Sequence, residues 1–243
     1  MDLNLSSHHS NKLVFFEKIG STNEFLLQNA EVDATEWPDL SVVCAGQQTS
    51  GRGRNQREWK SPEGSSLSCS ILVRNPKGAA HWYGILLAMA LTRSLKDQGV
   101  QAGLKCPNDV LIAENKIAGV LGQASADFLV VGIGLNLRPI EIENSVSLEE
   151  LNLDLDFDFQ LSRLLAEFVS LRSQFEVSSV AAVLEELREI SHTLGRKVRV
   201  TTEAGILEGR ATDIDSQGRL VLDRGAQTVS AGDILHLRGA EEI

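Results

Sequence analysis

The chain has 243 residues, of which 42% are hydrophobic, and this is enough for one large domain or for a medium domain with a small one beside it. Its 33 acidic residues outnumber its 23 lysines and arginines, and the net charge of −10 argues against a general nucleic-acid-binding protein. The three cysteines form no CxxC pair, so we expect a reducing, cytoplasmic location without a disulfide framework or a zinc site. No apolar run is long enough for a signal peptide or a membrane span.

Strands and helices alternate through the first three quarters of the chain. Apolar and alternating segments predict strands at 13–19, 41–47, 66–74, 103–105, 110–113, 116–124 and 128–136. Helical spacing of apolar residues predicts helices at 23–29, 79–98, 159–175 and 179–193. Thr22 is expected to cap the first helix and Ser179 the last, which would end at Gly195. The polar residues before the first strand, including His8 and His9, are expected to be disordered.

The sequence pattern changes near residue 195 and differs through the rest of the chain. Short strands are predicted at 197–201, 205–213, 218–222 and 227–230, with glycine-containing turns between them. This pattern is typical of a small all-β barrel. We therefore predict an α+β protein, with a mixed β-sheet flanked by helices over residues 1–194 and a small β domain over residues 195–243.

A long polar loop follows the second predicted strand and concentrates positive charge in an acidic chain. It contains Gly51-Arg52-Gly53-Arg54, followed by Arg57 and Trp59. Glycines let the backbone approach a ligand closely, and arginine forks bind phosphates. A solvated basic loop or a contact with RNA explains the composition equally well, although the glycine–arginine unit occurs only once.

A second candidate is the segment Lys105-Cys106-Pro107-Asn108-Asp109 at the end of a predicted strand. A lysine held there can neutralise charge that develops on a phosphate or a carboxylate. Asp109 could hold Mg²⁺, which takes few protein carboxylates and relies on substrate phosphates for its other ligands. The structural alternative is an ordinary Pro-Asn-Asp turn between two strands.

Three further segments carry polar side chains beside small residues. They are Ser21-Thr22-Asn23 at a helix start, Lys116 to Gly119, and Gly132 to Asn136 at the end of the most apolar strand. Each also has a purely structural explanation, respectively a helix cap, a tight strand contact and a bulged strand.

Taken in order, these segments resemble the biotin–protein ligase family. The match runs from Ser-Thr-Asn through Gly-Arg-Gly-Arg and Arg-x-Trp to Lys-x-Pro-Asn-Asp, Lys-Ile-Ala-Gly-Val-Leu and Gly-x-Gly-x-Asn, over roughly residues 13–140. The resemblance implies a catalytic domain related to class II synthetases and an SH3-like C-terminal domain. It implies ATP-dependent formation of biotinyl-5′-AMP, with Mg²⁺, and transfer of biotin to a lysine of a biotin carboxyl carrier protein.

The resemblance also implies roles for the matching positions. Lys105 and Arg54 would be catalytic, and Asp109 would bind Mg²⁺. Biotin would be bound by Ser21, Thr22, Asn23, Gln48, Arg52, Gly53, Arg54, Lys105 and Gly119. The nucleotide would be bound by Arg57, Trp59, Asn108, Lys116 and Asn136.

Two departures from the family bear on these expectations. Cys106 stands where the family usually has tryptophan, which implies looser packing around a ligand. About a dozen residues precede the first strand, too few for the DNA-binding domain of some members, so no DNA binding is expected, whereas a homodimer through the central sheet is plausible by resemblance. Two rival functions stay open: a lipoate or octanoate–protein ligase, and a non-catalytic RNA-binding module.

Overall fold

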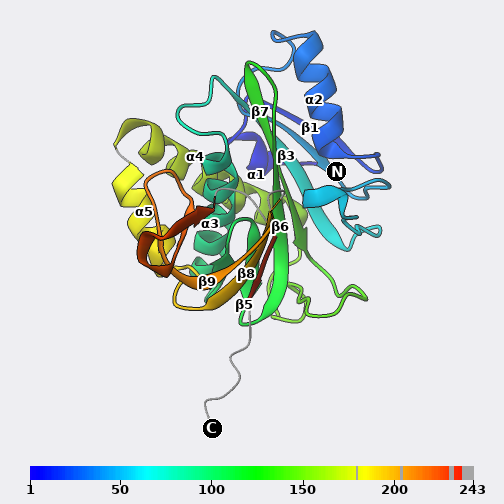
Figure 1. Ribbon diagram of the computed structural model, residues 1–243. Helices are drawn as coiled ribbons and strands as arrows, with labels where there is room; N and C mark the ends of the chain where they lie inside the picture. The colour runs from blue at the N-terminus through cyan, green and yellow to red at the C-terminus, as the bar shows by residue number, and fades with distance from the viewer. Residues whose placement is uncertain (179, 203–204, 230–232, 237–243) are drawn as a thin grey trace.

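A seven-stranded mixed sheet forms the centre of the computed structural model, which describes residues 1–178, 180–202, 205–229 and 233–236 (Figure 1). The strands lie in the order β1-β2-β3-β7-β6-β5-β4, with β1 and β2 parallel and the other neighbours antiparallel. Their bounds are β1 Lys12–Phe16, β2 Ser41–Ala45, β3 Ser66–Arg74, β4 Gly103–Lys105, β5 Asp109–Ile112, β6 Asn115–Ala124 and β7 Phe128–Asn136. The predicted α+β class with a mixed sheet is confirmed.

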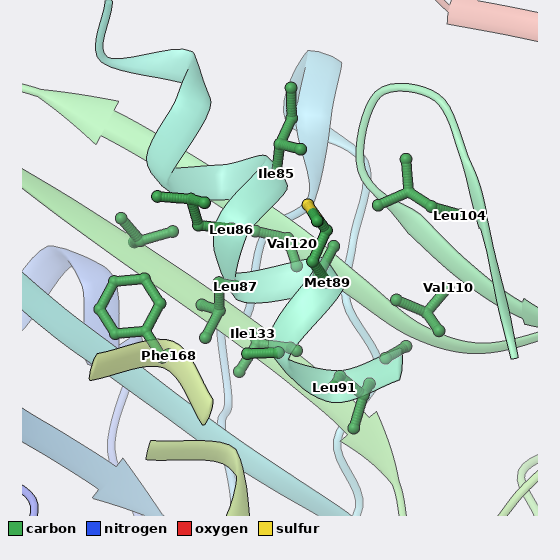
Figure 2. Close-up of a cluster of buried hydrophobic side chains, with 14 of the residues drawn as sticks. Ile85, Leu86, Leu87, Met89, Leu91, Leu104, Val110, Val120, Ile133 and Phe168 are labelled. Atoms are coloured by element: carbon green, nitrogen blue, oxygen red, sulfur yellow. The ribbon is translucent and has the colours of Figure 1, made fainter. Parts of the chain in front are cut away.

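Helices cover both faces of this sheet, because alternate residues of the central strands point to opposite sides. On one face, Leu26 of α2 (Thr22–Val32) packs in a cluster with Leu72 and Val130. On the other face, α3 (His81–Asp97) packs against Ile133 and is covered in turn by α4 (Phe157–Val177), whose Phe168 is fully buried. Figure 2 shows α3 between these two layers. This double cover explains why β7 is buried along its whole length.

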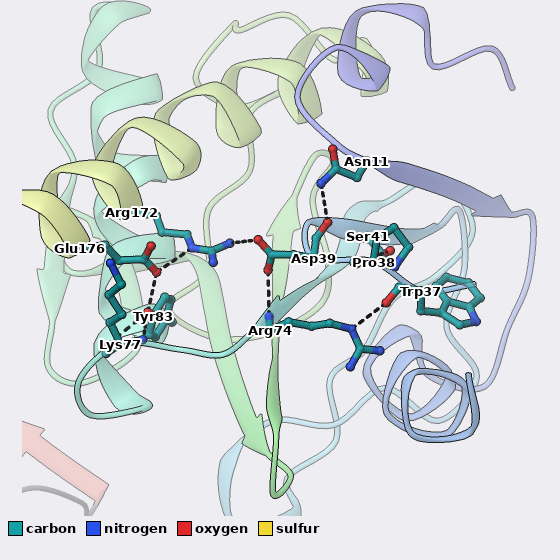
Figure 3. A network of polar contacts seen from close by, with 10 residues as sticks. All are labelled: Asn11, Trp37, Pro38, Asp39, Ser41, Arg74, Lys77, Tyr83, Arg172 and Glu176. Atoms are coloured by element: carbon teal, nitrogen blue, oxygen red, sulfur yellow. Dashed lines mark hydrogen bonds and ion pairs between the residues drawn. The ribbon is translucent and has the colours of Figure 1, made fainter. Parts of the chain in front are cut away.

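A network of polar side chains lies at the edge of the hydrophobic core, near β3. Arg172 of α4 forms ion pairs with Asp39 and Glu176, at 2.8 and 2.9 Å (Figure 3). Asp39 also accepts a hydrogen bond from the backbone N–H of Arg74, at 2.8 Å. Glu176 accepts from the Tyr83 hydroxyl, also at 2.8 Å. The network therefore holds α3, α4 and the loop before β2 together.

Two of the predicted helix-capping residues, Thr22 and Gly195, do not cap their helices in the structure. The cap of α2 is Ser21, whose hydroxyl accepts from the Glu24 N–H at 3.4 Å, because the Thr22 N–H is bound by the Gln48 side chain. Helix α5 (Val180–Glu189) ends well before Gly195, because the chain leaves it to run beside β4. The predicted cap at residue 179 lies outside the described residues.

The first residues are ordered by contacts with α4, so the prediction of a disordered N-terminus is wrong for this stretch. A single helical turn, α1 (Asn4–Ser7), lies against the start of α4 (Figure 1). The Asp158 carboxylate accepts from the backbone N–H groups of Leu5 and Ser6, at 2.8 and 2.9 Å. His8 follows this turn at the surface.

The C-terminal residues form a five-stranded antiparallel sheet in the order β11-β10-β9-β8-β12. The strands are β8 Lys197–Thr202, β9 Gly205–Ile214, β10 Leu220–Leu222, β11 Gln227–Val229 and β12 Asp233–His236. The prediction missed β12, which pairs with β8 from Asp233↔Thr201 to His236↔Val198. Val198 and Val200 belong to the same apolar cluster as α3, so one continuous core serves both sheets. No helix in the described part of the chain is long and apolar enough to span a membrane.

Candidate active site

One cleft of about 710 Å³ opens over strands β6 and β7. Its walls are the loop after β2, the turn between β4 and β5, the loop after β7, and part of the C-terminal sheet. Every residue to which the sequence analysis assigned a binding or catalytic role lines this cleft: Ser21, Thr22, Asn23, Gln48, Arg52, Gly53, Arg54, Arg57, Trp59, Lys105, Asn108, Asp109, Lys116, Gly119 and Asn136. The fold thus gathers segments that are far apart in sequence, while the role of each residue stays a prediction.

A polar corner held together by hydrogen bonds forms part of the cleft wall. The Gln48 side-chain oxygen accepts from the Thr22 N–H at 2.8 Å. The buried Ser70 hydroxyl lies 2.7 Å from Thr22 Oγ1 and 2.6 Å from Asn23 Oδ1. Asn23 is seated over Gly132, where an added Cβ would fall 2.0 Å from its Oδ1. Such a corner presents fixed hydrogen-bonding groups to a small polar ring.

The glycine–arginine loop folds back on itself as a narrow hairpin. The Trp59 N–H donates to the Gly51 oxygen at 2.9 Å, and the Gly53 N–H donates to the Arg57 oxygen at 2.7 Å. A Cβ at Gly51 would fall 2.7 Å from the Trp59 oxygen, so only glycine fits there. Arg54 reaches across the cleft and donates to Asn108 Oδ1 at 3.1 Å. The loop therefore lies next to the Lys105–Asp109 segment.

An indole platform lies on the floor of the cleft. The ring of Trp59 rests on Gly134 and Gly119, which face each other across β7 and β6. Lys116 Nζ lies 5.6 Å from the Trp59 ring centroid. The indole Nε1 is buried without a hydrogen-bond partner in the described residues. A flat aromatic surface beside a lysine suits a nucleotide base and its phosphates.

The Lys105–Asp109 segment turns sharply at a cis peptide bond between Cys106 and Pro107. Burial raises the pKa of the Cys106 thiol to about 11, although hydrogen bonds from Thr193 and Ser191 lower it in part. The thiol is therefore protonated near neutral pH and is a poor nucleophile. Lys105 forms no ion pair with any carboxylate in the described part of the chain.

Three carboxylates line the cleft, those of Glu58, Asp109 and Glu143, and Asp109 is the one that the sequence analysis assigned to a divalent cation. One of its oxygens lies 2.7 Å from Lys116 Nζ and also accepts from Asn108 Nδ2 at 3.1 Å. The described residues contain no cluster of three metal-ligating side chains. One carboxylate together with substrate phosphates is a common way to bind Mg²⁺, so this donor set fits that ion in the presence of a nucleotide.

Asn136 ends β7 with half of its amide engaged. Its Nδ2 donates to the backbone oxygens of Lys116 and Val146, at 3.3 and 3.1 Å. Its Oδ1 is buried and has no partner in the described residues. An acceptor left in this position suits a hydroxyl group, such as that of a ribose.

Several wall residues were missed by sequence reasoning. Arg199, Thr201 and Ile234 reach the cleft from β8 and β12 of the C-terminal sheet. Ile140 and Ile142 reach it from the loop after β7. Nothing in their local sequence marks them, because only the packing of the two sheets brings them to the cleft.

Comparisons with known proteins agree with this arrangement. Residues 15–136 match the biotin/lipoate A/B protein ligase family, and residues 193–237 match the biotin protein ligase C-terminal domain. The chain is 37% identical to the biotin–[acetyl-CoA-carboxylase] ligase of Mycobacterium tuberculosis, over 90% of this chain and 86% of that protein. It is 28% identical to the bifunctional ligase/repressor BirA of Escherichia coli, over 92% of this chain and 73% of that protein.

A solved structure resembles the whole fold. The biotin protein ligase of Aquifex aeolicus, in complex with biotin and ATP, superimposes with a TM-score of 0.81 and is 26% identical. The match covers 94% of this chain and all of that one (100%). The likeness extends over both sheets, because the match leaves only a small part of the chain uncovered.

Proposed function

This chain belongs to the biotin/lipoate A/B protein ligase family and is a biotin–protein ligase, and we propose that its cleft holds biotin and ATP end to end while they react. A carboxylate oxygen of biotin attacks the α-phosphorus of ATP, and diphosphate leaves. The product is biotinyl-5′-AMP. The amine of a lysine on a biotin carboxyl carrier protein then attacks the acyl carbon, loses a proton and expels AMP.

Biotin lies at the polar corner. Its ring system contacts Ser21, Thr22, Asn23 and Gln48, while its chain passes Gly119 toward Lys105. The hydrogen bonds that already fix Thr22 and Asn23 support this assignment, because a prearranged corner costs little ordering on binding. Arg52 and Gly53 belong to the loop that closes over the ligand.

ATP lies at the indole end. Trp59, Lys116 and Asn136 contact the base, the phosphates and the ribose, with Arg57 and Asn108 beside them. Asp109 holds Mg²⁺, which supplies charge neutralisation at the phosphates when it is bound. Lys105 and Arg54 stabilise the negative charge that develops as the carboxylate attacks the phosphorus.

The observation that carries this proposal is that Lys105 lines the same cleft as the polar corner and the indole, without a carboxylate partner in the described residues. The test is incubation of the protein with MgATP and biotin, lipoate or octanoate, followed by mass spectrometry of the acyl-adenylate. We expect biotinyl-adenylate alone, formed far more slowly but still measurably by Lys105→Ala. A lipoyl or octanoyl adenylate, or full activity of Lys105→Ala, would contradict the proposal.

Three further predictions about this enzyme concern its surroundings. We propose that it forms a homodimer through the central sheet, binds no DNA and works in the cytoplasm. Sedimentation at several concentrations, a DNA-binding assay and cell fractionation test these statements separately. The division into a catalytic domain over residues 1–194 and a C-terminal domain over residues 195–243 is likewise proposed, and limited proteolysis near residue 195 tests it.

A further inference from the structure

The segment that joins the two sheets lies against the strand that carries Lys105. After α5 the chain runs parallel to β4, and the Leu104 N–H donates to the Ile190 oxygen at 2.9 Å. The His192 N–H returns a hydrogen bond to the Leu104 oxygen, also at 2.9 Å. The His192 ring lies so close to Gly103 that an added Cβ would fall 1.9 Å from it. The joining segment thus acts as an additional strand at this edge of the sheet.

Thr193 is the residue of the joining segment that contacts the backbone directly after Lys105. Its side chain is fully buried, and its Oγ1 accepts from the Cys106 N–H at 3.0 Å. That N–H belongs to the peptide unit that links Lys105 to Cys106. Thr193 is itself held in a turn, because its own N–H donates to the Ser191 hydroxyl at 3.2 Å. The hydroxyl therefore holds one side of the peptide plane directly after Lys105, and the Asn108 N–H, which donates to the Lys105 oxygen at 3.2 Å, holds the other.

A histidine of the C-terminal sheet holds the same hydroxyl. His236 Nε2 lies 3.2 Å from Thr193 Oγ1, and His236 Nδ1 lies 3.5 Å from a guanidinium nitrogen of Arg196. Arginine can only donate, so Nδ1 is the acceptor, and the neutral ring carries its proton on Nε2 and donates it to Thr193. Arg196 is anchored by Glu114 of the β5–β6 turn, at 2.7 Å.

We propose that Thr193 is a positioning residue that orients Lys105 toward the reacting phosphate and carboxylate. Through its contact with His236, this orientation depends on the position of the C-terminal sheet. The inference rests on the proposed function, in which Lys105 stabilises the transition state. Catalysis is sensitive to small displacements of such a group, since an error of about 1 Å can cost about a hundredfold in rate. A flexible lysine side chain needs a fixed backbone to keep its direction.

The test compares variants that keep or remove the hydroxyl. Thr193→Val keeps the branched shape, and we expect kcat for biotinyl-adenylate formation to fall about ten- to a hundredfold with little change in the KM for biotin. Thr193→Ser keeps the oxygen and should restore most of the rate. Thr92→Val is the matched control, because Thr92 is also buried but bonds only within α3, to the Met89 oxygen at 2.7 Å. It should leave kcat unchanged.

A double variant tests whether Thr193 acts through Lys105. In a Lys105→Ala background, Thr193→Val should lower the residual rate by no more than about twofold, because the group that it positions is gone. A further large loss would overturn the proposal. So would a wild-type kcat in Thr193→Val, or an equal loss in Thr193→Ser.

If Thr193→Val does not fold, His236→Phe tests the same hydrogen-bond chain, and a wild-type kcat there would overturn the proposal. Failure of the proposed function looks different. In that case the wild-type protein forms no biotinyl-adenylate, or Lys105→Ala is fully active, whatever residue stands at position 193.

Discussion

The indole of Trp59 lies so close to Gly134 that a Cβ on that glycine would fall 2.2 Å from the ring. Real side chains never approach this closely, so the ring takes this place only because the strand carries no side chain there. Gly119, the partner of Gly134 on β6, leaves the second half of the same space, with the ring 3.4 Å from its virtual Cβ. The glycine pair is therefore part of the seat for the indole, where we propose that the nucleotide binds.

Gly134→Val should displace Trp59 and weaken both ATP binding and folding. We expect the KM for ATP to rise about tenfold and the free energy of unfolding to fall by about 1–3 kcal/mol, as for overpacking elsewhere. Steady-state adenylation and urea unfolding measure the two effects. Gly122→Ala is the control, because a Cβ there meets only Leu129, at 3.9 Å. An unchanged KM for ATP in Gly134→Val would show that the indole seat has no part in nucleotide binding.

Asp109→Asn should raise the Mg²⁺ concentration needed for half-maximal adenylation about tenfold, because it removes the only carboxylate charge that we assign to the ion. The same change frees Lys116 from its ion pair, so the KM for ATP should be measured together with the Mg²⁺ dependence. Glu143→Gln is the matched control, since Glu143 also lines the cleft. If this Mg²⁺ concentration rose in Glu143→Gln but not in Asp109→Asn, the metal ligand would be Glu143, in the loop after β7, and not Asp109.

The central strands could be predicted from sequence because their apolar sequence pattern agrees with their burial in the sheet. The bounds of β3 and β7 are those expected, since both are apolar runs that end at turns. The first two strands end earlier, at Phe16 and Ala45, and continue only as a single bridge between Ile19 and Gln48. That difference depends on how two parallel strands separate, which the sequence does not encode locally.

The site was predictable to the extent that it is built from short contiguous motifs. The polar residues around Lys105 and Arg54 could be found because their chemistry is compact in sequence. Arg199 and Ile234 could not, since they approach the cleft only after the C-terminal sheet packs against the first. The role of Thr193 was hidden for the same reason, because its partner Cys106 is 87 residues away in the chain.

The stability of the protein should depend on the protonation of His236. Burial, followed by the nearby Lys105, Arg196 and His192, lowers the pKa of His236 to about 4, against an opposing effect of Glu114. The unfolded chain binds this proton near pH 6.5, so it carries more protons than the folded state between about pH 6.5 and 4. With respect to this group, the free energy of unfolding is therefore highest above pH 6.5, and it decreases as the pH falls toward 4.

Urea unfolding at several pH values measures this effect, with His236→Gln as the reference that cannot titrate. Between pH 6.5 and 4.5 the wild-type protein should lose about 1–2 kcal/mol more than the variant, a figure reduced from the full shift because the ring is only half-buried. Parallel curves for the two proteins would show that His236 titrates normally in the folded state.

Replacing Arg172 should destabilise the protein more than breaking an exposed ion pair on the same helix does. Its side chain is 12% exposed and bridges Asp39 and Glu176, so Arg172→Met leaves two carboxylates without their cation (Figure 3). Burial tends to raise the pKa of Glu176, but hydrogen bonds from Arg172 and Tyr83 outweigh it and hold that pKa below its usual value. We expect a loss of about 3 kcal/mol, typical of breaking a largely buried pair.

The matched control is Arg163→Met, also on α4, because Arg163 pairs with an Asp97 side chain that is 61% exposed. That change should cost less than about 1 kcal/mol, since water screens the pair. The two variants are compared by urea unfolding at pH 7. Equal losses of unfolding free energy would mean that the packing of the arginine side chain, and not its charge, determines the stability here. Both substitutions preserve that packing only in part. A loss confined to Arg172→Met that shrinks at low pH would tie it to the charges of Asp39 and Glu176, because protonated carboxyl groups no longer need the guanidinium.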